Sequence, residues 1–170
     1  EIIQQLDSIE KLNGMDCYIE YFIKNHTEKT CVNIDYTAKK QLIPKKIHYC
    51  WFGQNEIPDE YQRCIESWKK FCPDYEIIRW DETNYDVHKN LYVHQAYEHK
   101  QWAFVTDYAR VDILYHEGGL YFDTDVELIR SFDNLLTWRM FCGFESNEYV
   151  AWGLGFGSVK EEPLLQDVLN

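Results

Sequence analysis

The pattern of apolar and polar positions predicts an alternation of strands and helices in the first half of the chain. Residues 46–52 form a mostly apolar run that is typical of a buried strand. Residues 58–71 show the spacing of an amphipathic helix, with Pro58 in its first turn. Residues 75–80 form a second apolar run. The order strand, helix, strand indicates a βαβ unit, and therefore an α/β fold with a parallel pair of strands.

The pattern continues to the end of the chain. Residues 84–100 suggest two short helical stretches, and residues 103–116 predict a longer helix that stops at Gly118-Gly119. Its expected core stripe consists of Phe104, Tyr108, Val111 and Tyr115.

Shorter elements follow the Gly-Gly pair. We expect an extended segment at 126–129, a short helix at 132–136, a strand at 139–144 and a last helix from 162. Residues 151–157 alternate glycine with apolar residues, a spacing that fits either close approach to a ligand or an irregular edge strand.

The start of the chain differs from the rest. Residues 1 to about 26 carry helical periodicity, and residues 27–43 are polar and irregular. We therefore expect a helical N-terminal extension and linker over residues 1–43, followed by one α/β domain over residues 44–170.

Composition excludes some functions. The formal net charge of -12 argues against binding to nucleic acid or to an anionic membrane, because both require a basic surface. The six cysteines show no C-x-x-C pair and no zinc spacing, and we interpret them as reduced thiols of a cytoplasmic protein.

Two carboxylates, Asp123 and Asp125, follow a short apolar strand. Residues i and i+2 of a strand lie on one face, and two like charges held close together repel each other. Mg²⁺ or Mn²⁺ removes that repulsion and prefers one or two carboxylates together with substrate phosphates. The motif thus indicates a metal–diphosphate site, although Asp-x-Asp at the start of an ordinary loop is the alternative.

Two further signals come from other parts of the chain. Asp107 and Arg110 are neighbours on the surface of the predicted helix, and on spacing alone they could be an ordinary ion pair. His48 lies within a predicted buried strand, where a hydrogen-bonded core histidine is the expected role.

Three motifs in order resemble a known family: Ile47-His48-Tyr49-Cys50-Trp51-Phe52-Gly53, then Ala103 to Arg110 with its Asp-x-x-Arg, then Gly118-Gly119-Leu120-Tyr121-Phe122-Asp123-Thr124-Asp125. Together they resemble the DXD-containing glycosyltransferases of the initiating mannosyltransferase and capsular polysaccharide type, which belong to glycosyltransferase family 32. The resemblance covers about residues 43–167. It implies a GT-A fold, a Rossmann-like mixed sheet flanked by helices. It also implies that the catalytic domain at 44–170 is truncated at its C-terminal end.

The resemblance also implies roles for individual residues. Asp125 would bind Mn²⁺ or Mg²⁺, and Asp123 would contact the donor ribose, or the metal through water. Asp107 and Arg110 would hold the hydroxyls and the leaving oxygen of the donor sugar, and Trp51 would stack on the nucleotide base.

The function implied is transfer of a hexose from UDP- or GDP-hexose to a glycan or lipid-linked acceptor in capsular polysaccharide synthesis, with retention of anomeric configuration. We expect a bacterial cytoplasmic location, at the inner face of the membrane, and peripheral membrane association of the full-length protein. Two alternatives stay open. One is a phosphatase of the haloacid dehalogenase type, with Asp123 as nucleophile. The other is a glycan-binding module without catalysis.

Overall fold

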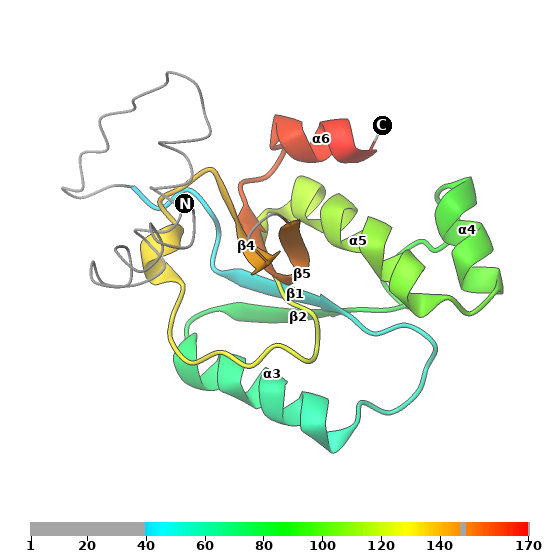
Figure 1. Ribbon diagram of the computed structural model, residues 1–170, viewed down its shortest axis with the longest axis horizontal. Coiled ribbons are helices and arrows are strands. Elements are labelled where there is room, and N and C mark those ends of the chain that lie inside the picture. Colours follow the sequence, from blue (N-terminus) through cyan, green and yellow to red (C-terminus); the bar gives the residue numbers. More distant parts are fainter. Residues whose placement is uncertain (1–39, 147–148, 170) are drawn as a thin grey trace. The chain divides into compact units, whose positions relative to one another are not determined.

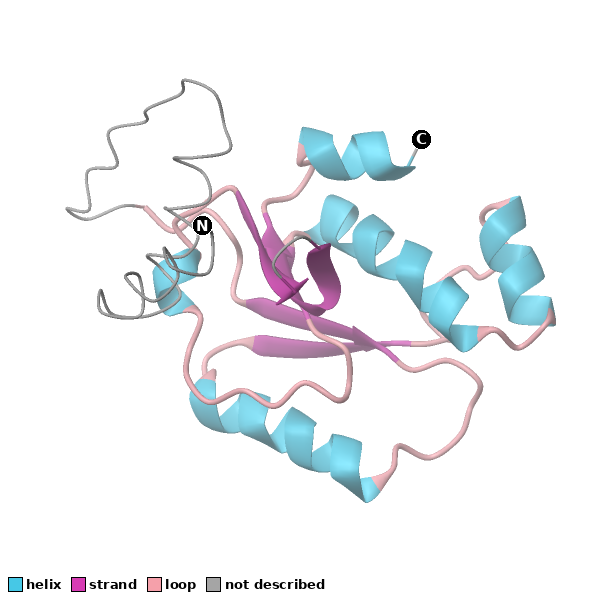
Figure 2. Ribbon diagram, viewed as in Figure 1, coloured by secondary structure: helices cyan, strands magenta, loops and turns pink. Residues whose placement is uncertain are grey.

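The computed structural model describes residues 40–146 and 149–169, and within this range it describes no side chains at 144–153. The helices predicted at the start of the chain lie outside the described residues. The described part forms five strands and several helices (Figure 1, Figure 2). In chain order these are β1 (Lys46–Cys50), α3 (Asp59–Phe71), β2 (Glu76–Trp80), α4 (Leu91–Glu98), α5 (Trp102–Glu117), β3 (Gly119–Tyr121), the 3₁₀ turn η2 (Asp133–Leu135), β4 (Met140–Ser146), β5 (Tyr149–Ser158) and α6 (Pro163–Leu169).

The strands form one mixed sheet in the order β2-β1-β3-β5-β4. Strand β1 pairs in parallel with β2, as the βαβ pattern predicts, and it also pairs in parallel with β3. Strand β5 runs antiparallel between β3 and β4. The mixed α/β sheet expected from the sequence is therefore confirmed.

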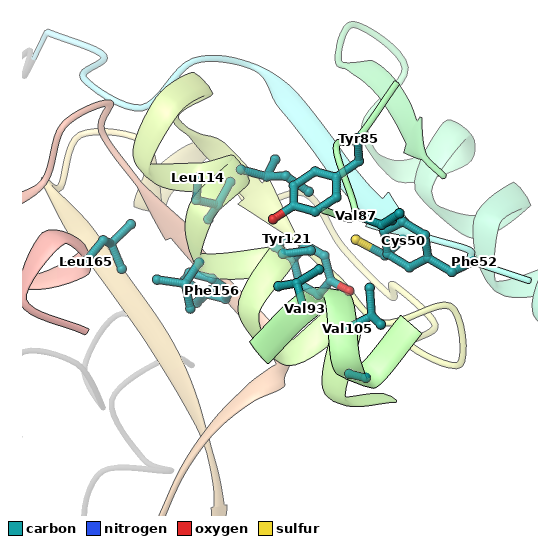
Figure 3. Packing of buried hydrophobic residues seen from close by; sticks show 14 residues of the cluster. Cys50, Phe52, Tyr85, Val87, Val93, Val105, Leu114, Tyr121, Phe156 and Leu165 are labelled. Atoms are coloured by element: carbon teal, nitrogen blue, oxygen red, sulfur yellow. The ribbon is translucent and has the colours of Figure 1, made fainter. Parts of the chain in front are cut away.

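Helices cover both faces of this sheet. Figure 1 shows α3 on one side, and α5 with α6 on the other. On the α3 side, the buried indole of Trp68 contacts the rings of Tyr49 and Phe122. On the α5 side, Figure 3 shows a cluster that extends from Leu165 past Phe156 and Tyr121 to Phe52.

Helix α5 buries a different stripe from the predicted one. Val111 is buried, but Phe104 is 51% exposed, and the helix packs instead through Val105 and Ala109 and through the consecutive residues 110–114. The prediction for Phe104 was wrong because α5 is contacted by the sheet, by α4 and by α6. Because several elements pack around α5, a wider arc of its surface is buried, and the small side chains of α5 allow those elements to approach closely.

The edge-strand prediction for residues 151–157 was also wrong, because β5 lies inside the sheet. Gly155 and Gly157 in this strand face apolar side chains. A Cβ on Gly157 would lie 2.5 Å from the ring of Phe141 and 2.7 Å from Leu120. The absence of a side chain at this position is thus required by core packing.

Only one helix, α4, forms between residues 84 and 100, where two helical stretches were expected. The segment before it turns back on itself, with Asp81 and Asn84 bonding to nearby backbone groups. Such Asx turns compete with helix formation.

Strand β3 starts directly after α5 because of the Gly118-Gly119 pair. Gly118 caps the helix through its N–H, which bonds to the carbonyl oxygen of Leu114 at 2.9 Å. Gly119 adopts φ +109°, and a Cβ there would lie 2.9 Å from the backbone oxygen of Lys46. The turn therefore places the Asp-x-Asp motif immediately beyond β3, at the carboxyl end of the parallel strands.

Candidate active site

A solvent-open cleft of about 410 Å³ lies at the carboxyl ends of β1 and β3. This is where open α/β sheets usually bind ligands. Three segments supply its walls: the chain after β1, the cleft-facing side of α5, and the Asp-x-Asp loop. The lining residues are Cys50, Trp51, Phe52, Asn55, Tyr61, Trp102, Ala103, Thr106, Arg110, Asp123, Thr124 and Asp125.

The cleft brings together four of the five residues singled out from the sequence. Trp51 comes from the chain after β1, Arg110 from α5, and Asp123 and Asp125 from the loop after β3. The fifth, Asp107, does not line the cleft itself, but its carboxylate contacts the Arg110 guanidinium at 2.9 Å.

Arg110 lies between two carboxylates. Its Nη2 contacts Asp107 Oδ1 at 2.9 Å, and its Nη1 contacts Asp123 Oδ2 at 3.4 Å. Its Nε donates a hydrogen bond to the backbone oxygen of Thr106, and its guanidinium lies over the ring of Tyr121 at 5.3 Å. The Arg110 side chain is only 10% exposed, so these contacts fix its orientation.

Asp123 is held from two sides. The hydroxyl of Tyr121 donates to its Oδ1 at 3.0 Å, while Arg110 contacts its Oδ2. Burial nevertheless raises the pKa of the Asp123 carboxyl above its usual value, and Asp125 and Asp107 add to that effect, while Arg110 opposes it. Burial also raises the pKa of Tyr121, which stays protonated and able to donate.

Asp125 has a different environment. Its side chain is exposed in the cleft, and the structure gives it no hydrogen bond or ion pair within residues 40–146 and 149–169. Its carboxylate oxygens are therefore available to a cation. No group of three or more potential metal ligands occurs among the described residues. Among the described residues the cleft offers two carboxylates, Asp123 and Asp125, and Mg²⁺ prefers one or two carboxylates in a site completed by phosphate and water.

The Trp51 indole is held in the wall of the cleft that the chain after β1 forms. Its Nε1 donates to the backbone oxygen of Asn55 at 2.8 Å, and its ring meets Tyr61 edge-on at 5.8 Å. The indole is half-buried and forms part of the cleft wall, so it can offer a flat apolar surface to a base.

The sequence did not single out Tyr121, Trp102 or Thr106. Tyr121 looked like an ordinary strand residue, and its contact with Asp123 depends on the turn after β3. Trp102, Thr106 and Arg110 recur every four residues and so lie along one side of α5. From Trp102 to Arg110 the helix rises roughly 12 Å. That periodicity could have identified the wall of the cleft.

His48 plays the expected core role. It is fully buried, its Nδ1 accepts from the Trp80 indole at 3.0 Å, and its Nε2 contacts the backbone oxygen of Gly118 at 3.0 Å. Burial lowers its pKa to about 4.

The fold is the GT-A fold of nucleotide-sugar-dependent glycosyltransferases. The solved structure of PaToxG glycosyltransferase superimposes on 75% of this chain and 59% of its own, with a TM-score of 0.51 and 20% identity. The family described as "Glycosyltransferase sugar-binding region containing DXD motif" matches residues 58–141. The chain therefore belongs to the DXD-containing glycosyltransferases, as its motifs indicated.

Several curated proteins are similar. Mannosyl phosphorylinositol ceramide synthase SUR1 of Saccharomyces cerevisiae is 32% identical over 72% of this chain and 33% of its own length. Inositol phosphoceramide mannosyltransferase 3 of Schizosaccharomyces pombe is 33% identical over 59% of this chain and 29% of its own. Subversion of eukaryotic traffic protein A of Legionella pneumophila is 24% identical over 64% of this chain and 20% of its own. The chain spans about a third of the length of the first two.

None of the helices in the described ranges has both the length and the apolar character needed to cross a membrane.

Proposed function

We propose that this protein transfers a hexose from a nucleotide-diphospho-sugar to a glycan or lipid-linked acceptor, with the help of a divalent cation. The observation that carries the proposal is one cleft lined by Trp51, Arg110, Asp123 and Asp125 in a member of the DXD family. Relatives named as mannosyltransferases favour mannose as the hexose. Their ceramide-based names favour a lipid-linked acceptor over a capsular polysaccharide.

The charges in the cleft suit departure of a nucleoside diphosphate. Breaking the sugar–phosphate bond builds negative charge on the leaving oxygen. The Arg110 guanidinium, oriented by Asp107 and by the Thr106 carbonyl, offers N–H donors to that charge. A Mn²⁺ or Mg²⁺ ion held by Asp125, with Asp123 beside it, would stabilise the same charge as a Lewis acid. Trp51 would stack on the base.

We also propose that transfer retains the anomeric configuration by a front-face route. A double displacement needs a carboxylate that can attack the sugar. Among the described residues lining the cleft, only Asp123 and Asp125 carry carboxylates, and both are assigned to the donor side. Neither is then available as a nucleophile. For the full-length protein we propose a cytoplasmic location at the inner face of the membrane.

Calorimetric titration tests the proposal directly. The chain is titrated with GDP and with UDP, each in Mn²⁺ and in EDTA. We expect one nucleotide to bind only with the metal, because a chain of charge -12 repels a bare diphosphate. Asp125→Asn should weaken this binding by at least about tenfold, since it removes a charged ligand. Asp167→Asn, an exposed substitution on α6, is the matched control and should leave affinity unchanged.

Three results would contradict the proposal. Unchanged affinity in Asp125→Asn would overturn the metal assignment. If neither nucleotide bound to the folded chain, nor to a longer protein containing it, hexosyl transfer from a nucleotide donor would be rejected. Hydrolysis of a phosphatase substrate that stops in Asp123→Asn would restore the phosphatase reading.

A further inference from the structure

Three large apolar side chains lie exposed together on α4 and the first turn of α5. Leu91 is 70% exposed, and Tyr92 and Phe104 are each 51% exposed. Tyr92, from α4, and Phe104, from α5, both line a hollow of about 430 Å³. We call Leu91, Tyr92 and Phe104 the α4 patch. Figure 1 shows α4 beside the N-terminal end of α5, on the side away from the sheet.

This grouping is unusual for a surface exposed only to water. Single exposed apolar residues are common, but clustered ones mark interaction surfaces. Eight large apolar side chains are exposed among the described residues, and three of them fall within residues 91–104. None of the three is needed to hold α4, because α4 is anchored through the buried side chains of Val93 and Ala96.

The charges around the hollow indicate which kind of partner could bind there. The chain contains 29 acidic residues, yet the hollow is lined by none of them: its walls are Tyr92, Gln95, Ala96, His99, Gln101 and Phe104. Glu98 and Lys100, the sequence neighbours of His99, are both exposed and carry opposite charges, so they add no net negative charge there. The chain as a whole, with its net charge of -12, is repelled by phosphate headgroups. Aromatic and aliphatic side chains flanked by amide and imidazole groups are typical of surfaces that insert shallowly into a bilayer interface.

The position of the patch fits the proposed reaction. Trp102 and Ala103 line the donor cleft, and Phe104, the next residue, lines the hollow. Phe104 and Arg110 are six residues apart on α5, roughly 9 Å along the helix axis, so a bilayer seated on the patch would lie close to the donor cleft.

From these observations we infer that the α4 patch is the surface by which the protein docks on a phospholipid bilayer that carries its acceptor. The partner is the bilayer interface itself, bound mainly through apolar contact. The inference rests on the proposed transfer to a lipid-linked acceptor, and it adds the face of the protein that meets the lipid.

Vesicle co-sedimentation tests this inference. The 170-residue chain is mixed with phosphatidylcholine vesicles, and the bound fraction is compared with that of the double variant Leu91→Asp/Phe104→Asp. The wild type should sediment with the vesicles. The double variant should bind at least about tenfold more weakly, because it lacks two apolar side chains that would be buried in the bilayer. The matched control is Ile129→Asp, which alters a side chain that is 76% exposed elsewhere, and it should bind like the wild type.

The outcomes separate the two proposals. Wild type that stays in the supernatant, or a double variant that sediments equally well, overturns the docking inference. So does a concentration-dependent dimer that the double substitution abolishes, because the patch would then join two copies of the chain. All three replaced residues are exposed, so circular dichroism should stay unchanged. Metal-dependent nucleotide binding, measured on the same samples, reports on the transferase proposal alone.

Discussion

At the scale of single residues, the candidate site is organised by the contacts of Arg110. The sequence indicated that Asp107 and Arg110 are helix neighbours, because three-residue spacing alone predicts that. It did not indicate that Arg110 also reaches Asp123, thirteen residues later. That contact depends on the turn at Gly118-Gly119, which brings the end of β3 back alongside α5.

The position of Asp123 leads to a prediction about stability. Because burial raises its pKa in the folded state, the folded protein binds its proton more tightly than the unfolded chain does. The stability that the Asp123 carboxyl contributes is complete below the pKa that it has in the unfolded chain. That stability is lost as the pH rises through the higher pKa that it has in the folded protein. At pH 7 the carboxylate is therefore destabilising. We expect Asp123→Asn to unfold at a higher temperature than wild type at pH 7, while losing function.

Thermal unfolding followed by circular dichroism between pH 7 and pH 4 checks this expectation. The difference between Asp123→Asn and wild type should shrink as the pH falls, because the wild-type carboxyl becomes neutral. Asp167→Asn is the control, since that carboxylate is exposed on α6. A variant less stable than wild type at pH 7 would mean that the contacts with Arg110 and Tyr121 outweigh the cost of burial.

At the scale of elements, α5 connects the site to the rest of the domain. One side of it faces the cleft, and Asp112 faces the turns that precede α4. The buried Asp112 carboxylate accepts hydrogen bonds from the Tyr85 hydroxyl at 3.0 Å and from Lys89 Nζ at 2.5 Å. His116 Nδ1 lies 3.3 Å from its other oxygen. An irregular segment is thus fixed against the helix that carries Arg110.

Removing the Asp112 carboxylate should loosen that segment. We expect Asp112→Ala to lower the free energy of unfolding by about 1–3 kcal/mol, because the buried Tyr85 hydroxyl and the Lys89 ammonium lose their acceptor. Urea denaturation of Asp112→Ala, Lys89→Met and the double variant measures the coupling between the two side chains. Effects that simply add would show that the ion pair contributes nothing to holding the segment.

The elements also show what local pattern can and cannot predict. Strands β1 and β2 and helices α3, α5 and α6 follow from periodicity and from turn residues, which are properties of neighbouring positions. The place of β5 inside the sheet does not, because its pairing with β3 joins residues that lie far apart in the sequence. The buried stripe of α5 was misassigned at Phe104 for the same reason: its packing partners come from other elements.

At the scale of the whole molecule, the order of three motifs predicted the GT-A fold and four of the residues that line the cleft. Trp51, Arg110, Asp123 and Asp125 come from three separate segments, and the resemblance alone linked them. Tyr121 was missed because nothing in its local sequence distinguishes it from a core aromatic, whereas the recurrence every four residues from Trp102 to Arg110 was a signal that was not used. The roles assigned to all these residues stay predictions until nucleotide binding is measured.

The central sheet gives the whole molecule a defined response to acid. Because burial lowers the pKa of His48 from 6.5 to about 4, the unfolded chain binds a proton that the folded protein excludes. The resulting stability is complete above pH 6.5 and is lost as the pH falls through 4. We expect this histidine to account for about 3 kcal/mol of the decrease in unfolding free energy across that interval.

Urea denaturation at several pH values measures the effect. His48→Gln should lower stability overall, since it breaks the contacts with Trp80 and Gly118, but its stability should depend less on pH between 6.5 and 4. His99→Gln, which alters an exposed histidine, should keep the wild-type pH dependence. An unchanged dependence in His48→Gln would assign acid sensitivity to other groups.

The placement of Arg110 between Asp107 and Asp123 has a consequence for selectivity. In most anion sites the guanidinium is available to any phosphate that diffuses in. Here two carboxylates already compensate its charge, so inorganic phosphate would have to displace them and would gain little in exchange. A diphosphate that binds together with a divalent cation would face less competition, because Asp125 and Asp123 would hold the cation and Asp123 would then compete less for the arginine. The ion pairs of Arg110 would thereby protect the cleft from occupation by the abundant simple anions of a cell.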